Sequence, residues 1–160
     1  MKKVNQSIQL PEGSFNVSMD FFDQSDFSKI KSLYIQWDIL SSQLVKYGGR
    51  RLNIPEVITE GIVCIHLGAG RLTTSKGNFN SSWDCYEIKN HRRVQVKATS
   101  VSNDLTSFGP KSVWDDLYFV NFFPYGKYDG SYEIFKIPNN LIHNFQVSKT
   151  QTFKQQQKAN

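Results

Sequence analysis

The chain of 160 residues is long enough to bury a hydrophobic core, and one domain is the default at this length. Its 39% hydrophobic and 14% aromatic content excludes an intrinsically disordered protein. Lys and Arg outnumber Asp and Glu by 19 to 14, and the net charge of +5 favours a polyanionic partner, although a merely basic soluble surface would give the same excess. We expect a single domain over residues 1–160, with 1–22 and 148–160 peripheral or flexible.

The sequence lacks the features of a membrane or secreted protein. It has no run of about 18 apolar residues and no signal peptide, so we expect a cytoplasmic protein without membrane contact. Cys64 and Cys85 lack the spacing of metal ligands and have apolar neighbours, which predicts reduced, structural thiols.

Two helices are predicted in the first half of the chain, after residues 1–22, which show only a loose apolar alternation. The first helix, capped by Asp23 or Ser25 and ended by Gly48-Gly49, has one apolar face: Phe27, Ile30, Tyr34, Trp37, Leu40 and Leu44. The second begins near Pro55 and ends at residues 68–70, with this buried side: Ile54, Val57, Ile58, Ile62 and Ile65.

The rest of the chain predicts mainly β-structure. We expect a short strand within 71–81, a hairpin of 83–88 and 93–101, a buried central strand at 117–123 and a strand at 132–137. Asn139 or Asn140 would cap a short helix to about Phe145, and the basic tail from Ser148 is either loose or faces DNA. The sum is an α/β fold with a mixed sheet of about five strands flanked by helices.

The hairpin carries the most informative set of polar residues. Asp84 lies on its first strand, and Gln95 and Lys97 lie two apart on its second, therefore on one face. The distance along the chain from Asp84 to Gln95 allows a strand, a tight turn and a return. Folding of the hairpin would therefore bring the Asp84 carboxylate near both side chains.

Such a set suits hydrolysis of a phosphodiester. Mg²⁺ prefers oxygen ligands, which the Asp84 carboxylate, the Gln95 amide and the Val96 backbone carbonyl could supply. Lys97 could orient the attacking water and offset charge in the transition state. An ordinary solvated sheet face shows the same alternation of Asp, Gln and Lys. The small or apolar neighbours of this strand favour an inner position, where a lysine needs a reason to be present.

Four blocks of sequence carry a family resemblance. They are Ser-Ser-Trp-Asp-Cys (81–85), Val-Gln-Val-Lys-Ala-Thr-Ser (94–100), Ser-Phe-Gly-Pro-Lys-Ser (107–112) and Trp-Asp-Asp-Leu-Tyr-Phe (114–119). Together they resemble the small type II restriction endonucleases that recognise GCNGC, and Thr-Phe-Lys-Gln-Gln-Gln (152–157) resembles the C-terminal end of that group. The wider pattern, an acid on one strand before acid-x-Lys on the next, looks like the PD-(D/E)XK nuclease core.

One residue departs from the superfamily pattern. The acid that normally precedes x-Lys is Gln95 here, which removes one negative charge from the metal site. The resemblance implies a compensating Glu on the preceding helix, with Glu60 as first choice and Glu56 as reserve, both off the Ile-rich face. A solvated helix residue, or for Glu56 a favourable charge in the first helical turn, is the alternative explanation.

Contacts to DNA require basic or amide side chains. Candidates for phosphate contact include Arg71, Lys76, Arg92, Arg93 and Lys111, together with the Arg50-Arg51 pair. Asn103, Lys111 and Lys149 could read base edges. Any of these is also an ordinary surface residue.

The function predicted from the sequence is Mg²⁺-dependent, sequence-specific cleavage of double-stranded DNA by a type II restriction endonuclease. A symmetric target implies two active sites, and hence a homodimer on DNA. Two alternatives stay open at this stage: another nuclease on the same core, such as a junction resolvase or repair nuclease, and a non-catalytic DNA-binding module.

Overall fold

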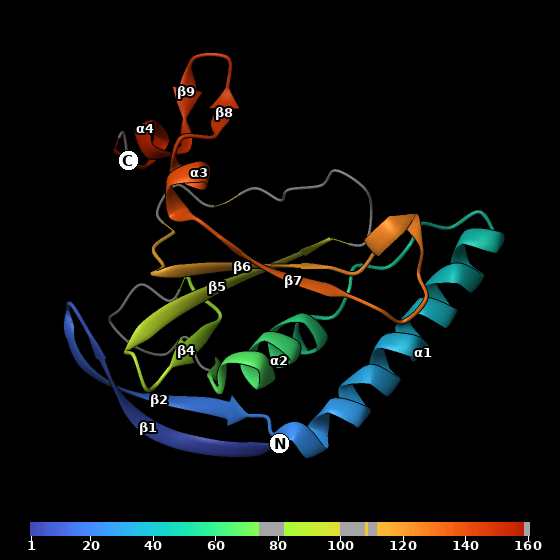
Figure 1. Ribbon diagram of the computed structural model, residues 1–160, viewed down its shortest axis with the longest axis horizontal. Helices are drawn as coiled ribbons and strands as arrows, with labels where there is room; N and C mark the ends of the chain where they lie inside the picture. The colour runs from blue at the N-terminus through green and yellow to red at the C-terminus, as the bar shows by residue number, and fades with distance from the viewer. Residues whose placement is uncertain (74–81, 100–107, 109–111, 159–160) are drawn as a thin grey trace.

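A twisted seven-stranded mixed sheet organises the protein (Figure 1). The computed structural model describes residues 1–73, 82–99, 108 and 112–158. The strands lie in chain order across the sheet: β1 (Lys2–Leu10), β2 (Gly13–Phe21), β3 (Gly70–Leu72), β4 (Cys85–Glu87), β5 (Arg92–Thr99), β6 (Asp116–Asn121) and β7 (Glu133–Ile137). All neighbouring strands pair antiparallel except β5 and β6, which are parallel.

Two helices pack against the sheet. After a short 3-10 turn, Gln24–Asp26, whose start Asp23 caps, helix α1 spans Phe27–Lys46, and α2 spans Glu56–Leu67. Gly68 closes α2 in a left-handed conformation (φ 65°), as the glycines predicted. Their apolar sides meet the sheet in the main core, whose members include Ile30, Trp37, Ile62 and Val94.

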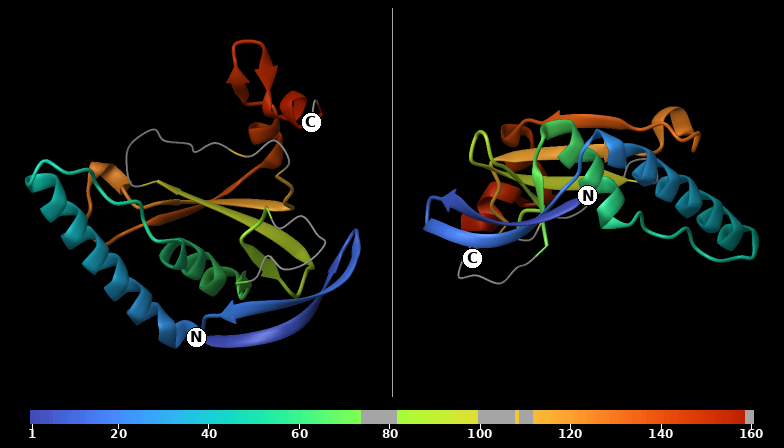
Figure 2. Two further views of the ribbon diagram at one scale, coloured as in Figure 1. Left: turned by 180° about the vertical axis from the view of Figure 1, so that it is seen from behind. Right: turned by 90° about the horizontal axis from the view of Figure 1, so that it is seen from below.

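The C-terminal segment forms a small substructure at the opposite end of the molecule from the β1–β2 hairpin (Figures 1 and 2). A second 3-10 turn, Pro124–Gly126, precedes β7, and then come α3 (Asn139–His143), β8 (Gln146–Ser148), β9 (Gln151–Thr152) and α4 (Phe153–Lys158). The tail that the sequence predicted to be loose or to face DNA is therefore structured as far as Lys158. Its Phe153 side chain is buried beside Trp114, Leu117 and Ile142.

Most predicted elements are confirmed, but the sheet has seven strands instead of about five. The additional strands are β1 and β2, where the sequence predicts no regular element. Only Ile8 is fully buried in β1, while Val17, Met19 and Asp20 are buried in β2. The apolar alternation of β1 is weak because this edge strand leaves most of its side chains exposed.

The predicted apolar face of α1 is correct over its first half only. Ile30, Tyr34 and Trp37 are buried, whereas Leu40 and Leu44 are 50% and 36% exposed. The helix extends beyond the sheet at its C-terminal end, so its last two turns have little to pack against (Figure 1). Among the described residues, no helix combines the length and apolar content needed to cross a membrane.

The burial of Ile8 predicts that the hairpin contributes to the stability of the whole sheet. Ile8 packs in a second core with Val17, Met19, Trp83 and Tyr86. Ile8→Ala should lower the free energy of unfolding by about 2–5 kcal/mol in urea denaturation. Ser7→Ala, on the exposed face of the same strand, should change it by no more than about 0.5 kcal/mol. Equal effects of the two variants would contradict this packing.

Candidate active site

Asp84 is held by backbone hydrogen bonds immediately before β4. Its N–H donates to the carbonyl of Val94 on β5 (3.0 Å), and its carbonyl accepts from the N–H of Leu72 on β3 (2.8 Å). The main chain of Asp84 is therefore held by hydrogen bonds to the strands on both sides, which fixes the position of its Cα atom. The carboxylate Oδ2 then accepts the backbone N–H of Val96 at 2.7 Å.

The Gln95 side chain meets the Asp84 carboxylate, as the hairpin predicted. Gln95 is buried, and its Nε2 lies 2.5 Å from Asp84 Oδ2 and 3.3 Å from the Val96 carbonyl oxygen. One amide group thus lies between a carboxylate and a carbonyl oxygen. These are the three groups that the sequence proposed as metal ligands, and the fold brings them together.

Lys97 lies two residues further along β5 and is half-buried. Burial raises the pKa of Asp84, and the charge of Lys97 is close enough to oppose that rise. The ammonium Nζ lies 5.3 Å from the centre of the Phe108 ring. Within the described residues Lys97 forms no salt bridge, so the structure leaves its charge available to a substrate.

Glu60 is buried on α2, although the sequence placed it off the apolar side of the helix. It is 8% exposed because α2 is covered over much of its circumference, whereas the Glu56 side chain is 83% exposed. The Arg71 Nε on β3 donates to Glu60 Oε2 at 2.5 Å. Of the two candidates for the compensating acid, Glu60 therefore lies in the interior and Glu56 at the surface, and the role of Glu60 in the site stays a prediction.

Burial perturbs both acids of the site. Loss of hydration, followed by the charge of Asp84, raises the pKa of Glu60 to about 7, against which Arg71 acts. Loss of hydration also raises the pKa of Asp84 to about 6, while the Val96 N–H and Lys97 oppose the shift. A buried and a half-buried carboxylate, both with raised pKa values, form a region that a cation would stabilise.

A third buried acid was missed by the sequence analysis. Asp20 on β2 is 6% exposed, its Oδ2 lies 3.9 Å from Arg71, and its Oδ1 has no hydrogen-bond donor among the described residues. Arg71 thus faces Asp20, Glu60 and, at 3.9 Å, Glu56. The alternation of Val17 and Met19 did place Asp20 on the opposite face, but its burial beside Arg71 of β3 could not be predicted.

The two cysteines lie beside these acids. Cys85 follows Asp84 and Cys64 is one turn beyond Glu60, and their sulfurs are 3.2 Å apart. Both are buried and free, which confirms the predicted reduced thiols. The hydrogen bond with Cys64 and burial raise the pKa of Cys85, so this thiol stays protonated and helps join α2 to β4.

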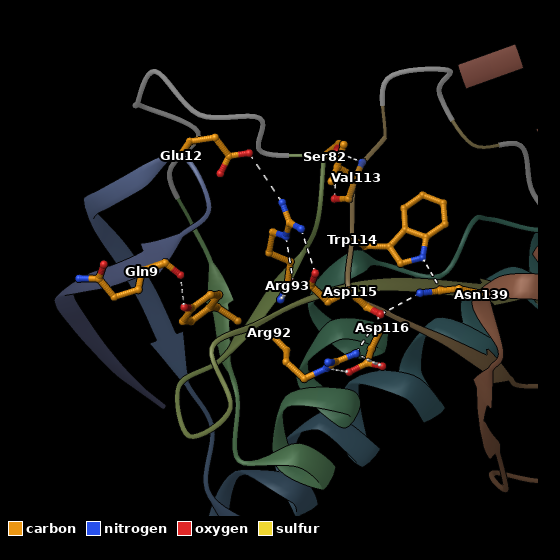
Figure 3. Close-up of polar contacts among 11 residues, drawn as sticks. Gln9, Glu12, Ser82, Arg92, Arg93, Val113, Trp114, Asp115, Asp116 and Asn139 are labelled. Carbon is orange, nitrogen blue, oxygen red and sulfur yellow. Dashed lines mark hydrogen bonds and ion pairs between the residues drawn. The ribbon is translucent and has the colours of Figure 1, made fainter. Parts of the chain in front are cut away.

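Arg92 and Arg93, both predicted to contact DNA phosphates, form ion pairs within the protein (Figure 3). Arg93 binds Asp115 through two nitrogens, at 2.9 and 3.0 Å. Arg92 binds Asp116 through two nitrogens, one of them at 2.8 Å, and Lys136 binds the same carboxylate at 2.8 Å. These bonds tie β5 to the start of β6. Lys76, Asn103 and Lys111 lie outside the described residues.

The donor set fits a divalent cation of the hard, oxygen-binding type. The described residues contain no group of three or more His, Cys, Asp or Glu side chains able to hold a metal ion. The Asp84 carboxylate instead lies beside two neutral groups, the Gln95 amide, which presents its nitrogen to Asp84, and the Val96 carbonyl oxygen. This set suits Mg²⁺ and similar ions, which tolerate few protein ligands and retain water.

Comparison with known proteins places this chain in a family. A model of the Bsp6I restriction endonuclease family matches residues 22–160. The chain belongs to this family. The type II restriction enzyme Bsp6I of Bacillus sp. (strain RFL6) is 30% identical over 138 residues, which cover 84% of this chain and 74% of that protein. No solved structure matches the chain.

Membership of the Bsp6I family supports one of the functions that the sequence left open, and the chain is a type II restriction endonuclease. Enzymes of this kind generally use divalent metal ions and bind double-stranded DNA. The junction resolvase, repair nuclease and non-catalytic alternatives receive no such support.

The raised pKa of Glu60 predicts how stability varies with pH in metal-free buffer. The folded state holds the Glu60 proton more tightly than the unfolded chain does, so the contribution of Glu60 to stability is greatest at low pH and is lost from about pH 4.5 to 7. Each such proton contributes a slope of at most about 1.4 kcal/mol per pH unit. Glu60→Gln should flatten this slope in urea denaturation with EDTA present.

Glu56→Gln is the matched control, because Glu56 lies on the same helix with an exposed side chain. It should leave the slope between pH 4.5 and 7 unchanged. A wild-type slope in Glu60→Gln would show that Glu60 does not hold its proton in the folded protein.

Proposed function

We propose that this member of the Bsp6I family hydrolyses double-stranded DNA with Mg²⁺ at a site formed by Asp84, Gln95, Val96 and Lys97. The observation that carries the proposal is the convergence of the Asp84 carboxylate, the Gln95 amide and the Val96 carbonyl within hydrogen-bond distance. We also propose a PD-(D/E)XK-like core within a single nuclease domain, since an acid before one strand and Gln-x-Lys on the next repeat that arrangement.

Each ligand has a distinct role in this proposal. Asp84 supplies the charged ligand, and Gln95 and Val96 supply neutral oxygens. The Gln95 amide must turn its oxygen toward the ion, a rotation about one bond that exchanges donor for acceptor. Glu60, buried within the electrostatic reach of Asp84, adds the second negative charge. When bound, the cation would polarise the scissile phosphate and acidify a water.

Lys97 acts on the attacking water and the phosphate and does not bind the metal ion. On the β5 face that it shares with Gln95, its ammonium can donate hydrogen bonds to the attacking water and to phosphate oxygens. Charge accumulates on those oxygens as the new bond forms, so a cation fixed beside them lowers the barrier. A mobile lysine would lose part of this effect.

The proposed DNA contacts divide into two groups. Arg71, Arg92 and Arg93 are paired with acids, so they can bind phosphates only by exchanging or sharing those partners. Lys76, Asn103 and Lys111 remain the proposed direct contacts, with bases of a GCNGC-type site as the proposed target, as the resemblance implies. Action in the cytoplasm follows from this target.

We propose that a homodimer binds the symmetric DNA site. An exposed strip beside the buried face of α1 and its C-cap supports this, because four large side chains recur there at intervals of seven, four and three residues. These side chains are Leu33 (45% exposed), Leu40 (50%), Leu44 (36%) and Tyr47 (93%). An apolar stripe of this spacing on a monomer's surface suits a helix of a second subunit.

Removal of the charged ligand should abolish cleavage. Asp84→Asn keeps the shape of the side chain but removes the charge that attracts the cation, so cleavage of plasmid DNA with Mg²⁺ should fall by at least about 10³-fold. Circular dichroism should show an unchanged fold, and binding to DNA in a gel-shift assay should persist through phosphate contacts. Normal turnover by folded Asp84→Asn would refute the site.

Replacement of the neutral ligand Gln95 by a charged one should preserve or increase Mg²⁺ affinity, in contrast to the loss of charge in Asp84→Asn. Gln95→Glu places a charged oxygen where a neutral one lies, so Mg²⁺ affinity measured by calorimetry should hold or rise and cleavage should persist. Lys97→Ala is the contrasting variant, because it should lose cleavage while both Mg²⁺ and DNA affinity stay near normal. Loss of Mg²⁺ binding in Gln95→Glu would mean that Gln95 does not face the ion.

A further inference from the structure

Lys97 is held by an aromatic face. Its Nζ lies 5.3 Å from the centre of the Phe108 ring, within the range in which a cation is attracted by an aromatic ring. Phe108 stands in one of the blocks that resemble the restriction endonucleases, 107–112, for which no role follows from the metal site. The contact joins that block to the proposed catalytic residue.

Phe108 is itself fixed by aromatic neighbours from distant parts of the chain. Its ring centre lies 4.9 Å from that of Trp114 and 5.5 Å from that of Phe153. Trp114 and Phe153 stack on each other at 5.7 Å, and Phe153 is 1% exposed. Trp114 also donates from its indole nitrogen to Asn139 at 2.9 Å (Figure 3). The ring that contacts Lys97 therefore packs on two buried aromatic side chains.

We propose that Phe108 is a positioning residue for Lys97, and that Trp114 and Phe153 hold the Phe108 ring for this purpose. The proposal rests on the catalytic role of Lys97 stated above and adds a function for the C-terminal segment. Phe153 opens α4, so the last helix of the chain would support the active site through two aromatic contacts.

An aromatic face suits this task better than a carboxylate. A carboxylate would hold the ammonium equally well but would neutralise the charge needed at the phosphate. The ring attracts the ammonium through its quadrupole and leaves hydrogen-bond donors free for water and phosphate. The cost of losing such a contact is modest, which sets the size of the expected effect.

The test measures single-turnover cleavage with saturating enzyme and Mg²⁺, together with DNA affinity, in three variants. Phe108→Leu should lower the cleavage rate by about 3- to 30-fold, the range expected for one cation–π contact, with DNA affinity within about 2-fold. Phe108→Tyr keeps the ring and should restore most of the rate. Phe145→Leu, an exposed aromatic of the same C-terminal region, should cleave at the wild-type rate.

Fluorinated phenylalanines at position 108 guard against a folding defect in the leucine variant. Added fluorines keep the shape of the ring but withdraw electron density from its face, which weakens the attraction for a cation. The cleavage rate should therefore fall stepwise with the number of fluorines. In a Lys97→Ala background, Phe108→Leu should cause no additional loss, because the contact no longer exists.

The outcomes separate this inference from the proposed function. If Lys97→Ala is inactive while Phe108→Leu and the fluorinated series cleave at the wild-type rate, Phe108 does not position Lys97 and only this inference fails. If Lys97→Ala cleaves normally, the proposed site itself is wrong. Loss of DNA affinity in parallel with rate in Phe108→Leu would also overturn the positioning role.

Discussion

The carboxylate of Asp84 accepts the backbone N–H of Val96 at the point where β3, β4 and β5 meet. This bond requires β5 to present the main chain of Val96 toward the end of β4, which places the Gln95 side chain beside the same carboxylate. Side chains that hold a metal or a phosphate need such rigid support. The positions of Lys97 and Glu60 depend on the same strands, because Lys97 lies on β5 itself and Glu60 lies on α2, which packs against the sheet.

The arrangement has an electrostatic cost in the absence of a cation. Asp20 and Glu60 are buried and Asp84 is half-buried, and Arg71 is the cation nearest to the first two. Burial of uncompensated carboxylates destabilises a fold unless they bind protons or a metal ion. The raised pKa values of Glu60 and Asp84 are the consequence. A bound divalent ion would relieve the strain, so metal affinity and fold stability are coupled here.

Local sequence patterns predicted the parts of the fold that depend on neighbouring residues. The apolar period gave α1 and α2, and the β-branched segments gave the Asp84 hairpin, including the meeting of Asp84 with Gln95. The ion pairs of Arg92 and Arg93 were not predictable, because Asp115 and Asp116 lie more than twenty residues away. From the sequence, both arginines were therefore expected to be unpaired and available to DNA phosphates.

Burial imposed by distant elements escaped prediction for the same reason. Glu60 became an interior acid only when α2 packed on the sheet, and Asp20 became one beside Arg71 of β3. Phe153 became a core residue only through Trp114. The Bsp6I family match supplied the function independently of these details. The residue roles rest on the geometry of the hairpin.

Anomalous diffraction from crystals of the protein bound to DNA and Mn²⁺ tests the account most directly. The Mn²⁺ signal should lie between the Asp84 carboxylate and the Val96 carbonyl, at about 2.0–2.3 Å from each oxygen, with Gln95 turned toward the ion. A metal held instead by Asp115 and Asp116, with none beside Asp84, would contradict it.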